Sequence, residues 1–197
     1  MKICVITGSR AEFDLLKNLV LELKNDNFFK IKLLVTGAHL SNYFGKTLNY
    51  IKKSKIKVDK AIDISIKNDD IKSISNSFSL GVKKFSSIFD KIKPDAILIL
   101  GDRYEIFACA ISACLNRIPI IHIHGGERTE GSIDEGLRHS TTKLSHIHFV
   151  STKEYQNRVI QLGENKKFVF NVGSLGVEAI KKIKIIKKKK FRRKVKL

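Results

Sequence analysis

The sequence contains no tryptophan, one methionine, two prolines and three cysteines among its 197 residues. The cysteines, Cys4, Cys109 and Cys114, are odd in number, form no Cys-X-X-Cys pair and each lie in an apolar run, where cysteine packs as a small hydrophobic residue. This usage argues against a disulfide framework and favours a reducing compartment.

Long apolar runs are also missing. No stretch approaches the ~18–20 apolar residues that a membrane-spanning helix requires. The apolar run before Gly8 is too short, and an acidic residue follows it too soon, for a secretion signal. We therefore expect a cytoplasmic location and no membrane partner.

Acidic residues are scarce, because 19 Asp and Glu stand against 38 Lys and Arg, a formal net charge of +19. The segment Lys181–Leu197 holds eleven basic residues and no acidic one, so 27 basic and 19 acidic residues remain elsewhere, a charge of +8. We divide the chain into a domain at residues 1–178 and a lysine-rich tail at residues 179–197. The domain suits an anionic ligand such as a nucleotide diphosphate, whereas the tail suits non-specific binding of a polyanion.

Short apolar runs alternate with amphipathic helical windows along the domain. Apolar residues at three- and four-residue spacing predict a long helix over Ile71–Ile92, ended by Pro94, and Ala96–Leu100 is apolar throughout, as a buried parallel strand requires. Further strands are expected at Lys2–Thr7, Phe29–Thr36, Ala61–Ile66, Pro119–His124, His146–Ser151 and Phe168–Val172, and further helices at Phe13–Lys24, Lys46–Lys53, Glu105–Leu115, Glu135–Leu144 and Lys153–Leu162. The alternation predicts an α/β fold with a Rossmann-like parallel sheet flanked by helices.

Polar and glycine-rich segments follow several of these strands. Ligands of open parallel sheets bind outside the carboxyl ends of the strands, so these segments should meet at one edge, called here the carboxyl edge: Gly8–Arg10, Gly37–His39, Gly101–Arg103 and His124–Glu127. Asp102 is a candidate for ligand contact there. The alternative is that it caps the following helix, a common use of aspartate.

The loop after His124 combines two glycines with four carboxylates, from Glu127, Glu130, Asp134 and Glu135. Proton abstraction from a sugar carbon needs such a base, and departure of a phosphate group benefits from a second acid or base. A solvated acidic loop in which Asp134 caps a helix explains the same residues without a function.

Five histidines cluster in the same region: His122, His124, His139, His146 and His148. A zinc site would need ligands that converge, and His122 and His124 share one strand face. Satisfied structural histidines are more frequent, so no metal is expected.

The first strand is followed by Gly8-Ser9-Arg10, where a helix amino end attracts anions and Arg10 supplies a forked donor suited to phosphate. Arg10 occupies the place of the second glycine of the dinucleotide fingerprint, and Leu40 stands where a P-loop ending at Gly45-Lys46-Thr47 needs its first glycine. Nicotinamide binding and a P-loop ATPase are therefore excluded.

Taken together, these segments resemble the hydrolysing UDP-N-acetylglucosamine 2-epimerases of sialic and legionaminic acid biosynthesis. The similarity spans residues 1–178 and lies in TGSRAEFDLL, TGAHLS, GDRYEIFACAISA, IPIIHIHGGERTEGSIDEGLRHSTTKLSHIHFVST and VGS. The resemblance implies a GT-B fold, of which this chain is the amino-terminal domain without the carboxy-terminal one. It also implies anti elimination of UDP from a UDP-sugar and hydration of the glycal to the 2-epimer, without metal or other cofactor, by a homo-oligomer.

The resemblance also assigns residues. Asp102 and Asp134 would be catalytic carboxylates, and Arg10, Ala11 and Arg103 would lie near the UDP diphosphate. Many relatives have a further carboxylate at position 124, where this chain has His124. Either His124 or nearby Glu127 takes that acid/base role.

Relatives continue through a second domain that this sequence lacks, and we expect a frameshift in the lysine-coding tract. A separately encoded second half is one candidate partner. The chain alone should be inactive, because a site built from two domains loses its positioning when one is absent. Two alternatives stay open: a basic polyanion- or nucleic-acid-binding α/β module, and an unrelated nucleotide-binding module. The domain has no recognition module for specific nucleic acid.

Overall fold

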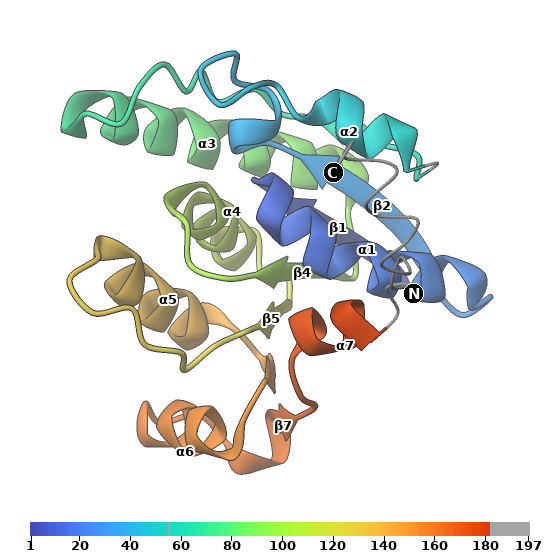
Figure 1. The fold of residues 1–197 in the computed structure, drawn as a ribbon, viewed down its shortest axis with the longest axis vertical. Helices are drawn as coiled ribbons and strands as arrows, with labels where there is room; N and C mark the ends of the chain where they lie inside the picture. Colours follow the sequence, from blue (N-terminus) through green and yellow to red (C-terminus); the bar gives the residue numbers. More distant parts are fainter. Residues whose placement is uncertain (55, 182–197) are drawn as a thin grey trace, which may run out of the picture.

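The computed structural model of the chain describes residues 1–54 and 56–181. One sheet of seven strands, all paired in parallel, has the order β3-β2-β1-β4-β5-β6-β7 (Figure 1). The strands are β1 Lys2–Thr7, β2 Lys30–Val35, β3 Lys60–Ala61, β4 Ala96–Leu100, β5 Ile120–Ile123, β6 Ile147–Val150 and β7 Val169–Asn171. The helices are α1 Arg10–Asn25, α2 Leu48–Lys53, α3 Ile71–Ile92, α4 Tyr104–Leu115, α5 Ile133–Leu144, α6 Lys153–Gln161 and α7 Leu175–Lys181, with 3-10 turns at Gly37–His39 and Lys166–Phe168.

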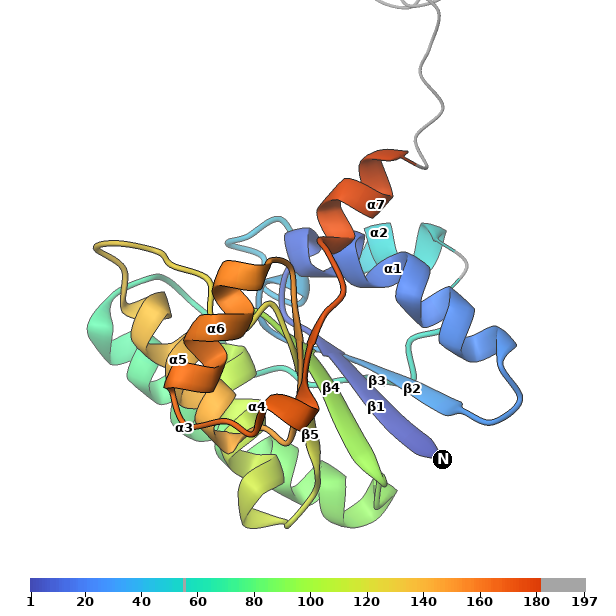
Figure 2. The same cartoon turned by 90° about the horizontal axis from the view of Figure 1, so that it is seen from below.

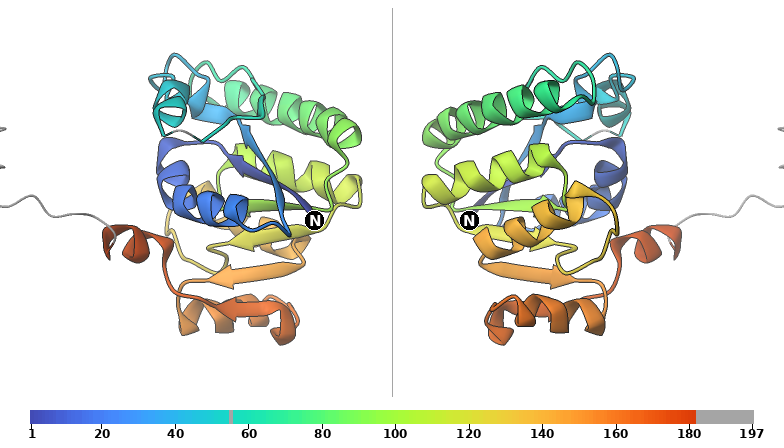
Figure 3. Two further views of the ribbon diagram at one scale, coloured as in Figure 1. Left: turned by 90° about the vertical axis from the view of Figure 1, so that its right-hand side faces the viewer. Right: turned by 90° about the vertical axis from the view of Figure 1, so that its left-hand side faces the viewer.

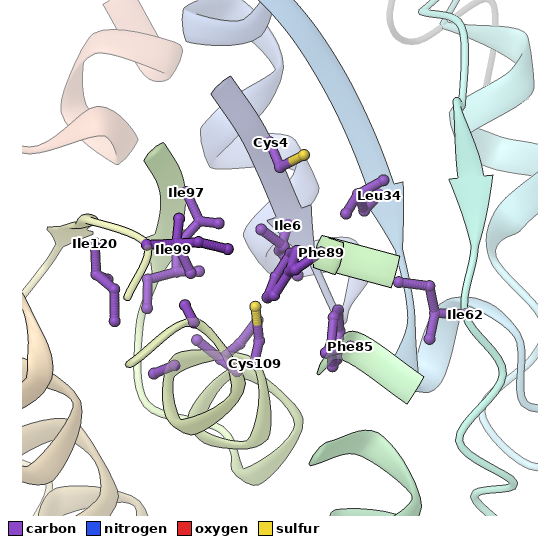
Figure 4. Packing of buried hydrophobic residues seen from close by; sticks show 14 of the residues in the cluster. Cys4, Ile6, Leu34, Ile62, Phe85, Phe89, Ile97, Ile99, Cys109 and Ile120 are labelled. Carbon is purple, nitrogen blue, oxygen red and sulfur yellow. The ribbon is translucent and has the colours of Figure 1, made fainter. Parts of the chain in front are cut away.

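Helices cover both faces of the sheet. Helices α1, α2 and α7 lie on one face, whereas α3, α4 and α5 lie on the other and α6 packs beside β7 (Figures 2 and 3). Because successive side chains of a strand point to opposite faces, β4 contributes Ile97 and Ile99 to one apolar cluster and Leu98 and Leu100 to the other. Figure 4 shows the first cluster, in which strand residues meet Phe85 and Phe89 of α3 and Cys109 of α4.

The predicted Rossmann-like parallel sheet is therefore confirmed, with two differences. The third strand was expected at Ala61–Ile66 but ends at Ala61, although Ile62, Ile64 and Ile66 are buried. Their alternation reflects packing beneath α3 rather than strand pairing, and Ser65 between them has φ 58. Helix α7 was not predicted.

Cys114 differs from its expected environment. Cys4 and Cys109 are buried, but Cys114 is exposed near the end of α4, so it does not pack as a small core residue. All three thiols are free.

Strands β1 and β4 are neighbours in the sheet, but the chain after β1 crosses to one face and the chain after β4 crosses to the other. Such a topological switch point opens a crevice outside the carboxyl ends of the two strands. The loops after β1, β4 and β5 flank it, so the predicted carboxyl edge is a real feature of the fold. None of the helices in the described part of the chain is long and apolar enough to cross a membrane.

Candidate active site

Asp102 lies two residues after the end of β4, and its carboxylate forms an ion pair with Arg138 of α5. The Arg138 side chain is only 5% exposed. It also donates hydrogen bonds to the carbonyl oxygen of Glu127 at 2.7 Å and to Oγ1 of Thr129 at 2.8 Å. Arg138 therefore ties Asp102 to the loop that follows β5.

His124 and Glu127 form a second pair beside the first. His124 adopts a left-handed backbone conformation, with φ 66, immediately after β5. Its Nδ1 lies 3.2 Å from Oε1 of Glu127, and the Ser151 hydroxyl donates to the same oxygen at 3.1 Å. Because a carboxylate only accepts hydrogen bonds, Nδ1 carries the proton of the neutral ring and Nε2 keeps its lone pair. That Nε2 has no hydrogen-bond partner among the described residues.

The surroundings shift the pKa of Asp102 in the first pair and that of His124 in the second. Burial raises the pKa of Asp102, and the carboxylates of Asp134 and Glu127 raise it further, against the opposing effect of Arg138. Burial lowers the pKa of His124, although Glu127 acts in the opposite direction. A carboxyl group that protonates more readily and an imidazole that stays neutral are suited to proton transfer.

Asp134 lies near enough to Asp102 for its negative charge to raise the pKa of that carboxyl. Helix α5 is capped by Ser132, whose hydroxyl accepts from the Asp134 backbone N–H at 3.2 Å, so Asp134 is not the cap. Asp134 precedes Arg138 by four residues and so lies on the same side of the helix.

Asp102 does not cap a helix either. The residue before α4 in the capping position is Arg103, and the Asp102 carboxylate is engaged by Arg138. The solvated-loop interpretation holds for Glu130 alone among the four acids of the loop, because Glu130 is exposed and pairs with exposed Arg128 at 2.7 Å. Glu135 instead accepts from the Thr129 backbone N–H at 3.0 Å and stabilises the loop.

Arg103 pairs with a buried carboxylate that lies against the loops after β1 and β2. Its Nε donates to Oε1 of Glu105 at 2.6 Å, and the Glu105 side chain is fully buried. A Cβ atom on Gly8 would lie 2.7 Å from Cγ of Glu105, and one on Gly37 would lie 2.9 Å from Oε1. The two glycines therefore make room for the carboxylate that holds Arg103.

Arg10 and Ala11 lie at the exposed start of α1. Arg10 pairs with Asp14 at 3.6 Å and lies over the ring of Tyr50 at 4.7 Å. The amino end of α1 is also engaged internally, because Oε2 of Glu12 accepts from the Gly8 backbone N–H at 2.7 Å. The fold thus gathers Asp102, His124, Glu127 and Asp134 closely, while Arg10, Ala11 and Arg103 line the same edge through other contacts.

Two functional candidates were missed by sequence reasoning. Arg138 resembles any surface arginine of a helix, and its only signal was the four-residue spacing from Asp134. Glu12 lies inside a helix, yet burial raises its pKa to about 8, with Glu105 adding to the effect.

The remaining histidines show no convergence on a metal. His122 and His148 are buried in neighbouring strands, and His122 contacts backbone and Thr142 rather than His124. Within residues 1–54 and 56–181, no group of three or more His, Cys, Asp or Glu side chains could hold a metal ion. The tail at residues 179–197 lies almost entirely outside the described residues, and only its first three residues are seen, as the end of α7.

A large cavity of about 720 Å³ lies away from this polar cluster, between α1, α7 and the strand residues Leu98, Ile121 and Phe149. Its lining is mostly apolar and offers little to a diphosphate. Size alone therefore does not identify the site, and the polar cluster at the carboxyl edge is the better candidate.

Comparison with known proteins identifies the family of the chain. The family model described as UDP-N-acetylglucosamine 2-epimerase matches residues 21–196. The chain is 46% identical over 188 residues to the GDP/UDP-N,N'-diacetylbacillosamine 2-epimerase (hydrolyzing) of Campylobacter jejuni, covering 95% of this chain and 49% of that protein. It is 45% identical over 177 residues to polysialic acid biosynthesis protein P7 of Escherichia coli, covering 90% and 45%.

Solved structures show the same fold. The UDP-GlcNAc 2-epimerase from Neisseria meningitidis bound to UDP-GlcNAc superposes with a TM-score of 0.82 at 25% identity, over 99% of this chain and 54% of that one. The sheet is thus the amino-terminal domain of a GT-B fold. The chain spans about half the length of the curated relatives it matches. It belongs to the UDP-N-acetylglucosamine 2-epimerase family.

Proposed function

We propose that this chain supplies the catalytic carboxylates of a hydrolysing 2-epimerase acting on UDP-N-acetylglucosamine or a related UDP-diacetamido sugar. The observation that carries the proposal is the convergence of Asp102, His124, Glu127 and Asp134 around buried Arg138, beside the crevice between β1 and β4. Relatives at 46% and 36% identity are hydrolysing diacetylbacillosamine 2-epimerases, which supports a modified sugar as substrate.

The proposed reaction has two steps. A base removes the proton from C2 of the sugar while the bond between C1 and the diphosphate oxygen breaks, which gives UDP and a 2-acetamidoglucal. Water then adds across the double bond, its oxygen to C1 and a proton to the opposite face of C2. The products are UDP and the free 2-epimeric sugar, and the only co-reactant is water.

Within the cluster we assign proton acceptance to the His124–Glu127 pair, in which Glu127 orients the ring through Nδ1. A base oriented by a third group is a recurring catalytic arrangement. Asp102, whose pKa is raised mainly by burial, is suited to hold or return a proton, and Asp134 adjusts that pKa by its charge.

We assign the diphosphate to Arg10, Arg103 and the backbone at Ala11, beside the amino end of α1. The Glu12 carboxyl lies there too, but its pKa of about 8 keeps it protonated at neutral pH. A neutral Glu12 does not repel an anionic ligand.

Residues 1–178 constitute the catalytic domain in this proposal, and residues 179–197 are a basic tail. The chain spans about half the length of its relatives, so in this proposal turnover also requires the other half of the enzyme, and the assembled enzyme is a homo-oligomer. The three free cysteines suit a cytoplasmic location.

UDP release from UDP-N-acetylglucosamine and from UDP-N,N'-diacetylbacillosamine tests the proposal, using this chain alone and fused to the remaining half of the Campylobacter jejuni relative. We expect release by the fusion and not by the chain alone, and loss of release in the Asp102→Asn fusion. Asp26→Asn, far from the site in the turn after α1, is the matched control. Unchanged release in the Asp102→Asn fusion would refute the assignment.

A further inference from the structure

His122 lies in the middle of the candidate site without contacting the space where a ligand would bind. The residue is fully buried in β5. Its Nε2 lies 2.9 Å from the carbonyl oxygen of Gly101, and its Nδ1 lies 3.2 Å from Oγ1 of Thr142. The imidazole therefore bridges the end of β4 and helix α5.

Each end of this bridge is adjacent to one member of the Asp102–Arg138 ion pair. Gly101 immediately precedes Asp102 and has φ 86. Thr142 lies one turn after Arg138 in α5, and its Oγ1 is 3.0 Å from the Arg138 carbonyl oxygen. The loop that carries the carboxylate and the helix that carries the guanidinium are thus joined through one side chain.

The surrounding chain is built around this bridge. A Cβ atom on Gly125 would lie 3.0 Å from Oγ1 of Thr142 and 3.2 Å from Nδ1 of His122. Glycine at position 125 lets the loop that carries His124 and Glu127 pass close over the bridge. The loops after β4 and β5 and helix α5 therefore all pack against this one imidazole.

The direction of the hydrogen bonds follows from their chemistry. The Gly101 carbonyl only accepts, so Nε2 carries the proton and Nδ1 keeps its lone pair. The Thr142 hydroxyl has one proton, which it shares between Nδ1 and the Arg138 carbonyl oxygen. Burial lowers the pKa of His122 to about 3, so the ring is neutral under ordinary conditions. The bridge keeps one tautomer and does not exchange protons with a ligand.

We propose that His122 is a positioning residue. By linking Gly101 to Thr142, it holds the Asp102 carboxylate at the place where it pairs with Arg138. This inference deepens the proposed function and rests on it only for its effect on turnover. Its effect on the Asp102–Arg138 pair can be measured whether or not the chain is part of an epimerase.

Four variants of the full chain test the bridge. His122→Leu removes both contacts, Thr142→Val removes one, and His122→Gln keeps an N–H donor near the position of Nε2. The control is His148→Gln, because His148 is a buried histidine paired with His122 in the neighbouring strand but contacts Glu164 at 3.2 Å. Far-ultraviolet circular dichroism checks that each variant is folded.

The first readout is the titration of the Asp102 carboxyl carbon by NMR. Arg138 lowers the pKa of Asp102, so a loosened pair should titrate at higher pH. We expect this upward movement in His122→Leu and, to a smaller extent, in Thr142→Val, with His122→Gln and His148→Gln titrating as the unmodified chain does. The long-range proton–nitrogen spectrum of the unmodified chain should show His122 protonated at Nε2.

The second readout is turnover by the fused enzyme described above. Misplacement of a proton-transfer group by about 1 Å can cost about 10²-fold in rate, so His122→Leu should lower kcat by roughly 10- to 100-fold while KM changes little. An Asp102 titration in folded His122→Leu or Thr142→Val that matches the unmodified chain would overturn the proposal. So would His122→Gln behaving like His122→Leu. If the fusion releases no UDP, the epimerase assignment fails, and the titration still decides the role of His122.

Discussion

Replacing Arg138 by methionine keeps the length of the side chain and removes the guanidinium at the centre of the candidate site. Three acceptors then lose their donor: the Asp102 carboxylate, the carbonyl oxygen of Glu127 and Oγ1 of Thr129. The carboxylate matters most, because burial already opposes its charge and Arg138 is the neighbouring group that favours it.

The size of the effect follows from the burial of the pair. Removing one partner of a buried ion pair costs about 3–5 kcal/mol. The Asp102 side chain retains 22% exposure, so water partly solvates the orphaned carboxylate and we expect about 3 kcal/mol at pH 7. By contrast, Arg128→Met should cost less than about 0.5 kcal/mol, because its ion pair with Glu130 is solvent-exposed.

The pH dependence separates charge from packing. In Arg138→Met the folded-state pKa of Asp102 lies above its unfolded value, so ionisation of Asp102 weakens the fold and protonation relieves the loss. Urea unfolding followed by circular dichroism should therefore show a smaller destabilisation at pH 5 than at pH 7. Adding Asp102→Asn should recover part of the stability. A loss that is equal at both pH values, or no larger than that of Arg128→Met, would refute the reasoning.

Two further predictions concern buried groups elsewhere. Burial raises the pKa of Glu12 from 4.5 to about 8, so ionisation of this residue should lower the stability of the unmodified chain as pH rises from about 4.5 to 8. Glu12→Gln should flatten that decline by up to several kcal/mol. If the urea-derived stabilities of the two proteins ran parallel from pH 5 to 9, this prediction would be wrong. Cys114 is exposed, whereas Cys4 and Cys109 are buried, and burial raises the pKa of Cys4 to about 11. A thiol reagent should therefore modify Cys114 quickly and the two buried cysteines only on unfolding. Rapid modification of three thiols would show that the core is not packed as described.

Continuous patterns were the most informative part of the sequence. The bounds of β4 and α3 were predicted as observed, because Ala96–Leu100 is apolar at every position and Pro94 ends the helical periodicity. Alternating isoleucines at positions 62, 64 and 66 misled the prediction of β3, since burial beneath a helix gives the same period as a half-buried strand. Short α7 carries too few residues for a periodic signal.

The candidate site was predictable in place but not in its connections. The positions after β1, β4 and β5 must meet at one edge of a parallel sheet, so the location of Asp102, His124 and Glu127 followed from strand order. The partners that hold them did not, because Arg138 and His122 act through tertiary contacts between segments 20 or more residues apart. Neither the contact of Arg138 with Asp102 nor that of His122 with Gly101 leaves a pattern in the sequence.

In the proposed function, the polar cluster at the carboxyl edge receives the UDP-sugar. The most direct measurement is an NMR titration of the isotopically labelled chain with UDP-N-acetylglucosamine, up to about 10 mM to allow for weak binding by half of a two-domain site. We expect the largest shifts at Arg10, Ala11, Asp102, Arg103 and His124. Shifts confined to the apolar cavity around Leu98 and Phe149, or none at saturating ligand, would contradict it.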